Sequence, residues 1–216
     1  MIALIGGMVG LDATSFPQAM ISRPLVAASL TGMLLGHPVA GIALGAVLET
    51  FALVVLPVGA ARYPETGTAA VSAAAAFSLL TPGGAGALLI ALAFGLYWER
   101  VAGASVILAR RWNERMVAES THMSASRLER LQLTAISIDF VRGAVVATSG
   151  ALIGVVLMRA IAPFWALGTS TTLALIGITA AAMLGAVLPL FGGWKERRIS
   201  FALGIACGVV ILLVQR

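Results

Sequence analysis

The chain has 216 residues, of which 60% are apolar and 11% are charged, and its mean hydropathy is +1.01. Too few polar residues remain to cover a soluble domain, which excludes a soluble enzyme and, despite the net charge of +5, a nucleic-acid-binding module. We therefore expect an all-α integral membrane protein, a multi-span helical bundle that forms a single membrane domain over residues 1–216.

The first two apolar stretches, residues 1–11 and 24–36, are shorter than the ~20 residues that a helical span requires. Glycine and proline residues such as Pro17 and Pro38 lie between and after them. The two stretches predict short broken or re-entrant helices, which are tolerated only where protein or a water-filled cavity covers the freed backbone groups. Half-helices of this kind often form ligand sites.

The next apolar stretch, residues 38–61, is long enough to cross a bilayer and carries Glu49 near its middle. A carboxylate at that depth is unfavourable unless it faces a polar cavity or finds a partner. Glu49 is therefore the first candidate for a functional residue.

Residues 66–94 are also apolar, but the sequence ThrProGlyGly interrupts them at 81–84. This interruption predicts two membrane segments joined by a tight turn rather than one long helix. The residues at 97–100, Tyr-Trp-Glu-Arg, then predict a membrane interface.

Residues 110–142 contain six of the fourteen basic residues together with four acidic ones, and they lack Gly and Pro. This composition predicts a helical, amphipathic arm on the cytoplasmic side. Spans at 143–162, 166–190 and 199–214 would then run outward, inward and outward. The basic cluster at 195–198 would lie in the cytoplasm, as the positive-inside rule requires.

An ordered set of short motifs occupies the region from Gly10 to Ser72. It consists of GLD at 10–12, RPL at 23–25, Gly32, Gly36, Gly41, Gly45, LE at 48–49, GAA at 59–61 and PE at 64–65. This set resembles the mannose/fructose/sorbose family of enzyme IIC subunits of the bacterial phosphotransferase system. Arg111 and Asn113, at the start of the polar arm, are also similar to that family.

The resemblance implies a multi-pass permease subunit of the bacterial inner membrane, with an elevator-like architecture and neither a phosphorylation site nor a cofactor of its own. Such a subunit binds a hexose-like sugar and presents it to the phosphorylated IIB protein. The implied partners are a IID membrane subunit, in a hetero-oligomer, and cytosolic IIA and IIB proteins. Five GxxxG spacings, which allow close helix packing, also favour a partner subunit.

Five charged residues are the predicted substrate-binding residues. Glu49 would accept two hydrogen bonds from vicinal sugar hydroxyls, or else it is structural and binds backbone amides or an arginine such as Arg23. Asp12 and Arg23 either pair with each other, or Asp12 accepts amide hydrogens of a half-helix. Arg62 and Glu65 either close over a bound sugar or belong to an ordinary interfacial loop.

Two other functions stay open from the sequence. One is a sensory or scaffold protein that has lost transport, because Pro57 stands where the family commonly has an asparagine. The other is a proton-coupled secondary carrier in which Glu49 takes up and releases a proton. The sequence has no second acid or histidine beside Glu49, which argues against this function.

Overall fold

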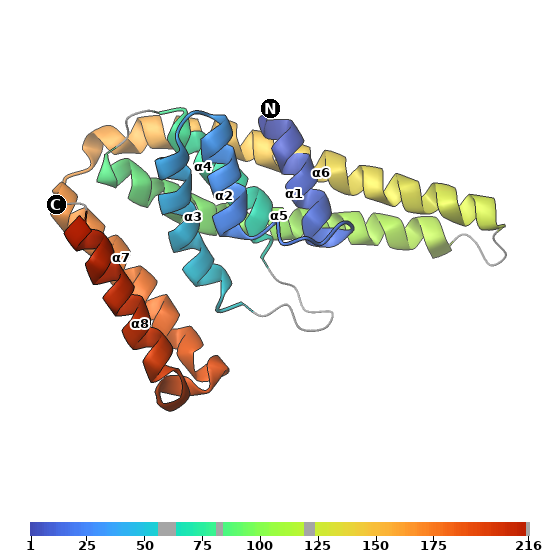
Figure 1. Cartoon of the computed structure of the whole chain (residues 1–216). Helices are drawn as coiled ribbons and strands as arrows, with labels where there is room; N and C mark the ends of the chain where they lie inside the picture. Colours follow the sequence, from blue (N-terminus) through green and yellow to red (C-terminus); the bar gives the residue numbers. More distant parts are fainter. Residues whose placement is uncertain (56–63, 81–83, 119–123, 215–216) are drawn as a thin grey trace.

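The computed structural model describes residues 1–55, 64–80, 84–118 and 124–214, and these residues form helices and connecting turns without a strand. The α-helices are α1 Ile2–Thr14, α2 Pro24–Leu34, α3 Pro38–Ala52, α4 Thr66–Ser78, α5 Ala85–Ala118, α6 Ala125–Ile161, α7 Thr169–Val187 and α8 Gly193–Val214 (Figure 1). Two short 3₁₀-helices, η1 Ala162–Phe164 and η2 Leu188–Phe191, precede α7 and α8. The prediction of an all-α fold is confirmed.

The helix α4 lies at the centre of the fold and contacts α1, α2, α3, α5 and α6. Its sequence, TGTAAVSAAAAFS, contains six alanines whose side chains are at most 2% exposed. Because alanine ends at Cβ, five neighbouring helices can approach this one helix closely. The core therefore combines close backbone packing around α4 with large buried side chains of the neighbouring helices, such as Leu44, Phe94 and Met158.

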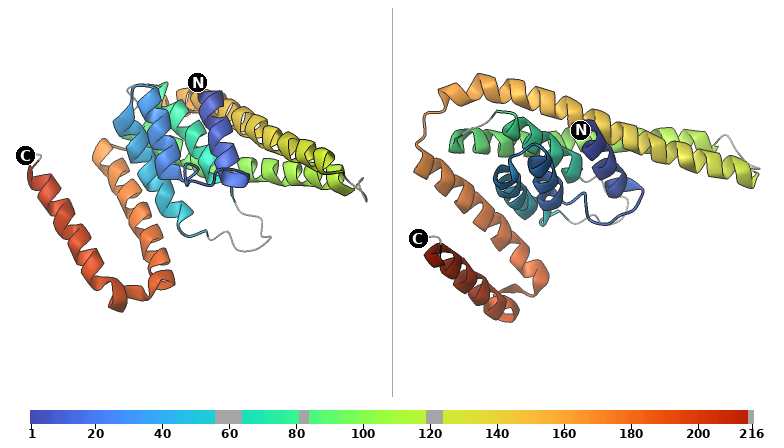
Figure 2. Two further views of the ribbon diagram at one scale, coloured as in Figure 1. Left: turned by 45° about the vertical axis from the view of Figure 1, so that its right-hand side comes forward. Right: turned by 45° about the horizontal axis from the view of Figure 1, so that its top comes forward.

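In the part of the chain that the structure describes, three helical segments are long and apolar enough to cross a membrane: Ala85–Val117, Ala125–Phe164 and Thr169–Phe191. The helices α1, α2 and α3 are shorter, with 13, 11 and 15 residues. They pack beside the long helices rather than continuing them (Figures 1 and 2). The predicted short segments at the N-terminus are thus present as short helices.

The predicted division within residues 66–94 is confirmed, since α4 ends at Ser78 and α5 begins at Ala85. The residues of the predicted interface at 97–100 lie inside helix α5, and their position relative to the membrane surface stays a prediction. Trp98 is buried, stacks on Phe94 and donates its indole N–H to the carbonyl of Val146 at 3.1 Å. The structure places this tryptophan inside the protein rather than among lipid headgroups.

The predicted spanning segment at 38–61 is not one long helix. Helix α3 ends at Ala52, which places Glu49 in its last turn rather than in mid-span. If the helix continued, the ring of Pro57 would clash with the carbonyl of Leu53 four residues earlier. Glu49 therefore lies at a helix end, where neighbouring helix termini are within reach.

The described residues of the polar arm at 110–142 belong to two helices rather than to one. The arm contains the last turns of α5 and the first half of α6, which run side by side past the short helices (Figure 2). Asp139 and Arg142 at its base are buried, with 7% and 8% exposure, so this part of the arm is not solvated.

The helices α7 and α8 project away from the other helices (Figure 1). Helix α7 contacts α3 and α5, whereas the main contacts of α8 are with η2. Large apolar side chains such as Leu173, Ile178 and Phe201 are exposed on these two helices. Lipid covers surface of this kind in a membrane protein.

The contact between α1 and α6 depends on glycines. A Cβ atom added to Gly143 would lie 2.9 Å from the Cα atom of Gly10, and one added to Gly10 would lie 2.7 Å from the Cα atom of Gly143. Both neighbours are backbone, which cannot move aside. Three of the five GxxxG spacings supply glycines to such backbone contacts, and a fourth, Gly150/Gly154, meets side chains of α4 and α5. Nothing lies within 4 Å of a Cβ added to Gly204.

Replacing Gly143 with alanine should lower the free energy of unfolding by about 1–3 kcal/mol, because the added methyl group overpacks a backbone contact. Thermal unfolding of the purified protein in detergent measures this loss. Gly177→Ala is the matched control, since Gly177 lies in a helix and has nothing within 4 Å of its added Cβ. That variant should be as stable as the parent or slightly more stable. Equal stability of both variants would contradict the close contact.

Candidate substrate cavity

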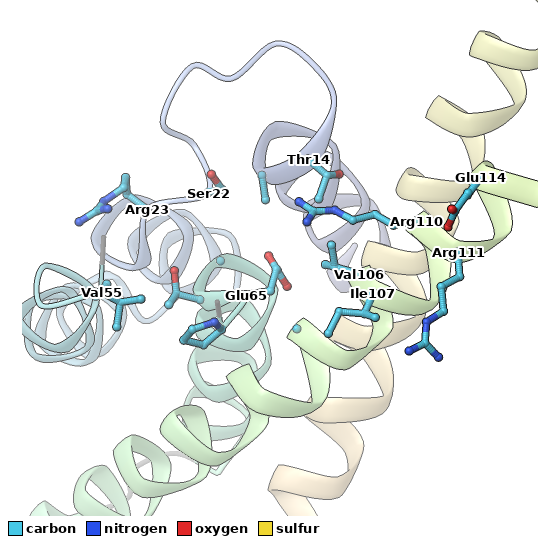
Figure 3. A pocket seen from close by; sticks show the side chains of 16 residues that line it. Thr14, Ser22, Arg23, Val55, Glu65, Val106, Ile107, Arg110, Arg111 and Glu114 are labelled. Atoms are coloured by element: carbon cyan, nitrogen blue, oxygen red, sulfur yellow. The ribbon is translucent and has the colours of Figure 1, made fainter. Parts of the chain in front are cut away.

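A cavity of about 430 Å³ opens where the ends of the short helices meet α5 (Figure 3). Its walls come from the end of α1, the residues before α2, the end of α3, the start of α4 and the middle of α5. Its polar lining residues are Thr14, Ser22, Arg23, Glu65, Thr66, Arg110, Arg111 and Glu114. The volume falls within the roughly 300–1,000 Å³ that small-molecule sites occupy.

Glu65 is the buried carboxylate of this cavity, with 4% exposure. It is the N-cap residue of α4, and its side chain accepts hydrogen bonds from the backbone N–H and the hydroxyl of Thr68. Its own backbone N–H donates to the carbonyl of Glu99 at 3.1 Å, which fixes the start of α4 against α5. Glu65 is thus a buried cap of α4 rather than an exposed loop residue, and its role as a sugar ligand stays a prediction.

The burial of Glu65 changes the pKa of its carboxyl group. Glu65 precedes α4 and lies outside the three candidate spans. Burial raises the pKa of its carboxyl group to about 6, although the charge of Arg142 and the N–H of Thr68 act to lower it. The carboxyl group therefore changes its charge close to neutral pH.

Glu49 and Arg23 form an ion pair beside the cavity. The Nε of Arg23 donates to Glu49 Oε1 at 2.8 Å, its Nη2 contacts the same oxygen, and Glu49 Oε2 accepts the backbone N–H of Leu25 at 3.1 Å. Leu25 is at the N-terminus of α2, where backbone N–H groups have no partner within the helix. These are the contacts of the structural alternative for Glu49, and its role as a sugar ligand stays a prediction.

Asp12 does not pair with Arg23. Its two carboxylate oxygens accept the backbone N–H groups of Ala19 at 2.5 Å and of Ser22 at 2.8 Å. These bonds hold the loop between α1 and α2, in which Gln18 adopts a left-handed backbone with φ of 59°. Asp12 thus fixes the loop that brings Ser22 to the cavity wall.

The five predicted residues therefore have different positions. Arg23 and Glu65 line the cavity. Asp12 and Glu49 do not line it, but they bind backbone N–H groups of Ser22 and Leu25, beside the lining residues. Arg62 lies outside the described residues, as does Pro57. A shared binding role for all five stays a prediction.

Comparison with known proteins identifies the family. The family model described as the sorbose-specific IIC component of the PTS system matches residues 1–192, which is most of the chain. The chain belongs to this family. The resemblance recognised in the motifs between Gly10 and Ser72 is thereby confirmed, and the chain is a membrane subunit of a sugar-transporting phosphotransferase system.

A solved structure titled "Structure of membrane protein" shares the fold of this IIC component. It superposes with a TM-score of 0.72 at 17% identity, over 100% of this chain and 94% of that chain. At this identity the similarity concerns the fold alone. No curated protein matches the sequence.

The IIC component also contains a buried charged network that the sequence analysis missed. Arg142 on α6 donates to Ser105 Oγ at 3.2 Å and to the carbonyl of Gly10 at 3.3 Å, and its Nε lies 3.6 Å from Asp139 Oδ1. Ser15 donates to the other oxygen of Asp139. The network joins α1, α5 and α6 behind the cavity. An opposite-charge pair at i and i+3 directly before an apolar span was the available signal.

The contribution of α5 to the cavity was missed as well. Arg110, Arg111 and Glu114 were assigned to the solvated arm, and they are exposed, but they also line the cavity mouth. Their position at the start of the arm was the available signal, because a site at the ends of short helices must meet the arm at its base.

Proposed function

We propose that this chain is the sugar-translocating IIC subunit of a phosphoenolpyruvate-dependent phosphotransferase system, and that the cavity is its sugar site. The observation that carries the proposal is the buried carboxylate of Glu65 in a cavity of about 430 Å³, whose lining also includes Arg23 and Pro64 of the family motifs. A carboxylate accepts hydrogen bonds from two vicinal hydroxyls. The hydroxyls of Thr14, Ser22 and Thr66 line the same space and supply further partners.

The polar arm is the proposed docking surface for the phosphorylated IIB protein on the cytoplasmic side of the bacterial inner membrane. It exposes apolar side chains, including Trp112, Val117 and Leu128, among its charges. Aromatic and apolar side chains surrounded by polar ones are typical of protein interfaces. The base of the arm forms the cavity mouth, so a protein docked there would lie beside the bound sugar. A IID-like membrane subunit is the proposed partner within the bilayer, in a hetero-oligomer.

The proposal is tested by sugar phosphorylation in membranes that contain this chain and its co-expressed partners. Phosphoenolpyruvate-dependent phosphorylation of an added hexose or ketose is the expected result. Uptake without phosphorylation would favour a secondary carrier. Neither activity, with IIB binding retained, would favour a scaffold protein.

Replacing Glu65 with glutamine should weaken sugar binding by roughly 10- to 100-fold, because a charge-assisted hydrogen bond contributes about 1.5–3 kcal/mol. Glutamine keeps the shape of the side chain, so α4 retains a cap at its first turn. Equilibrium sugar binding and thermal unfolding are measured on the same preparation. Glu196→Gln is the matched control, because Glu196 is exposed on α8 and does not line the cavity. Normal binding by the Glu65 variant would remove Glu65 from the site.

The pH dependence provides a second measurement on the same variants. Below pH 6 the carboxyl group of Glu65 is mostly protonated, because burial has raised its pKa to about 6. Sugar affinity of the wild type should therefore fall as the pH decreases through 6. The Glu65→Gln variant should have a low affinity that does not change over this range.

A further inference from the structure

The cavity changes in character along its length. Glu65 at the inner end is buried, whereas Arg110, Arg111 and Glu114 at the mouth are exposed. The mouth lies at the base of the polar arm, and the inner end lies among the short helices. A ligand in the cavity would thus have one end beside a carboxylate and the other beside arginines.

The three arginines of the lining point in different directions. The guanidinium of Arg23 is held by Glu49, which does not line the cavity. Figure 3 shows the guanidinium of Arg110 directed toward Thr14 and Glu65, whereas that of Arg111 turns away from them. Among the arginines of the lining, Arg110 therefore has the orientation needed to contact a ligand that reaches the mouth.

A guanidinium can donate hydrogen bonds to the hydroxyls of a neutral sugar, but only an anionic ligand also matches its charge. A phosphate group carries up to two negative charges, and a guanidinium group binds two of its oxygens at once. We propose that Arg110 binds the phosphoryl group during its transfer to the sugar and then the phosphate of the sugar phosphate product. This inference rests on the proposed function, since it takes the cavity as the sugar site.

In this transfer the bond between phosphorus and the donor side chain of the phosphorylated cytosolic protein breaks. A bond between phosphorus and a sugar hydroxyl oxygen forms, and the hydroxyl proton ends on the donor side chain. Arg110 supplies positive charge to the transferring oxygens and exchanges no proton. Preorganised cations of this kind act mainly on the transition state.

The test compares arginine variants in membranes that contain the full chain and its partners. Arg110→Gln should lower the kcat of sugar phosphorylation by about 10- to 1,000-fold, which is a larger factor than its loss of equilibrium sugar binding measured on the same membranes. Arg159→Gln, an exposed arginine on α6 outside the cavity and the arm, should have wild-type kcat. Arg111→Gln should lower kcat less than Arg110→Gln, which separates contact from general positive potential.

Inorganic phosphate provides an independent probe. It should inhibit phosphorylation by the wild type by competing for Arg110, and its inhibition constant should rise at least tenfold in Arg110→Lys, which keeps the charge but loses the two-oxygen fork. Arg110→Lys also tests the role of Arg110 if Arg110→Gln does not fold. Unchanged kcat in Arg110→Gln, or unchanged inhibition in Arg110→Lys, would overturn the inference. A wild type that neither binds nor phosphorylates a sugar would overturn the proposed function instead.

Discussion

Replacing Arg142 with methionine should lower the free energy of unfolding by about 3–5 kcal/mol, because it leaves a buried charge without its partner. Arg142 joins Asp139 on its own helix to Ser105 on α5 and the carbonyl of Gly10 on α1. Without the guanidinium, Asp139 keeps the hydroxyl of Ser15 and the carbonyl of Gly10 keeps that of Thr14, but the buried carboxylate loses its cation. We expect a lower unfolding temperature for this variant than for the wild type when thermal unfolding is measured in detergent.

A double variant separates the unpaired charge from the loss of packing. Adding Asp139→Leu to Arg142→Met removes both charges, and stability should recover to within about 1–2 kcal/mol of the wild type, since apolar replacements of buried pairs are often nearly neutral. Arg159→Met, at an exposed position on α6, is the matched control and should change stability by less than about 0.5 kcal/mol. A double variant that is no more stable than Arg142→Met would contradict the role assigned to this pair.

The second large effect is expected at Glu49. Glu49→Gln should lower the free energy of unfolding by about 1–3 kcal/mol, because the carboxylate binds both Arg23 and the N-terminus of α2. The sequence-based prediction is instead that this variant folds normally and binds sugar poorly. Thermal unfolding and sugar binding, measured together, distinguish the two roles.

A double-mutant cycle makes the distinction sharper. If Glu49 acts through Arg23, Glu49→Gln should reduce stability and sugar affinity much less when Arg23 is already glutamine, with a coupling of about 1–3 kcal/mol in stability. A full additional loss of sugar affinity in the Arg23→Gln background would show that Glu49 contacts the sugar directly. In that case the structural role would be secondary.

Much of the fold could be predicted from the sequence, because helix length and interruption are local properties. The short segments before Pro38 and the break at 81–84 are set by Gly and Pro residues that act on their immediate neighbours. The end of α3 at Ala52 was not predicted, although it is also a local property. Hydropathy continues past Ala52, and a hydropathy average does not register that a proline at position 57 disfavours helix in the preceding turn.

The contacts between helices could not be predicted in the same way. Hydropathy shows that Glu49 needs a partner, but several basic residues were compatible, and only the packing of α2 against α3 selects Arg23. Asp139 and Arg142 have the composition of a solvated arm, yet α1 covers them. Side-chain burial at such positions depends on which helix lies across from them, and one sequence contains no direct record of that.

The alanine surface of α4 determines which parts of this protein can change during evolution. Five helices rest on Cβ atoms of α4, so a larger residue there would move several neighbours at once. The cavity, in contrast, is built from helix ends and the first residues of the arm. Relatives with other ligand preferences can therefore diverge at these termini while the central packing is kept, which separates the residues that select a ligand from those that maintain the bundle.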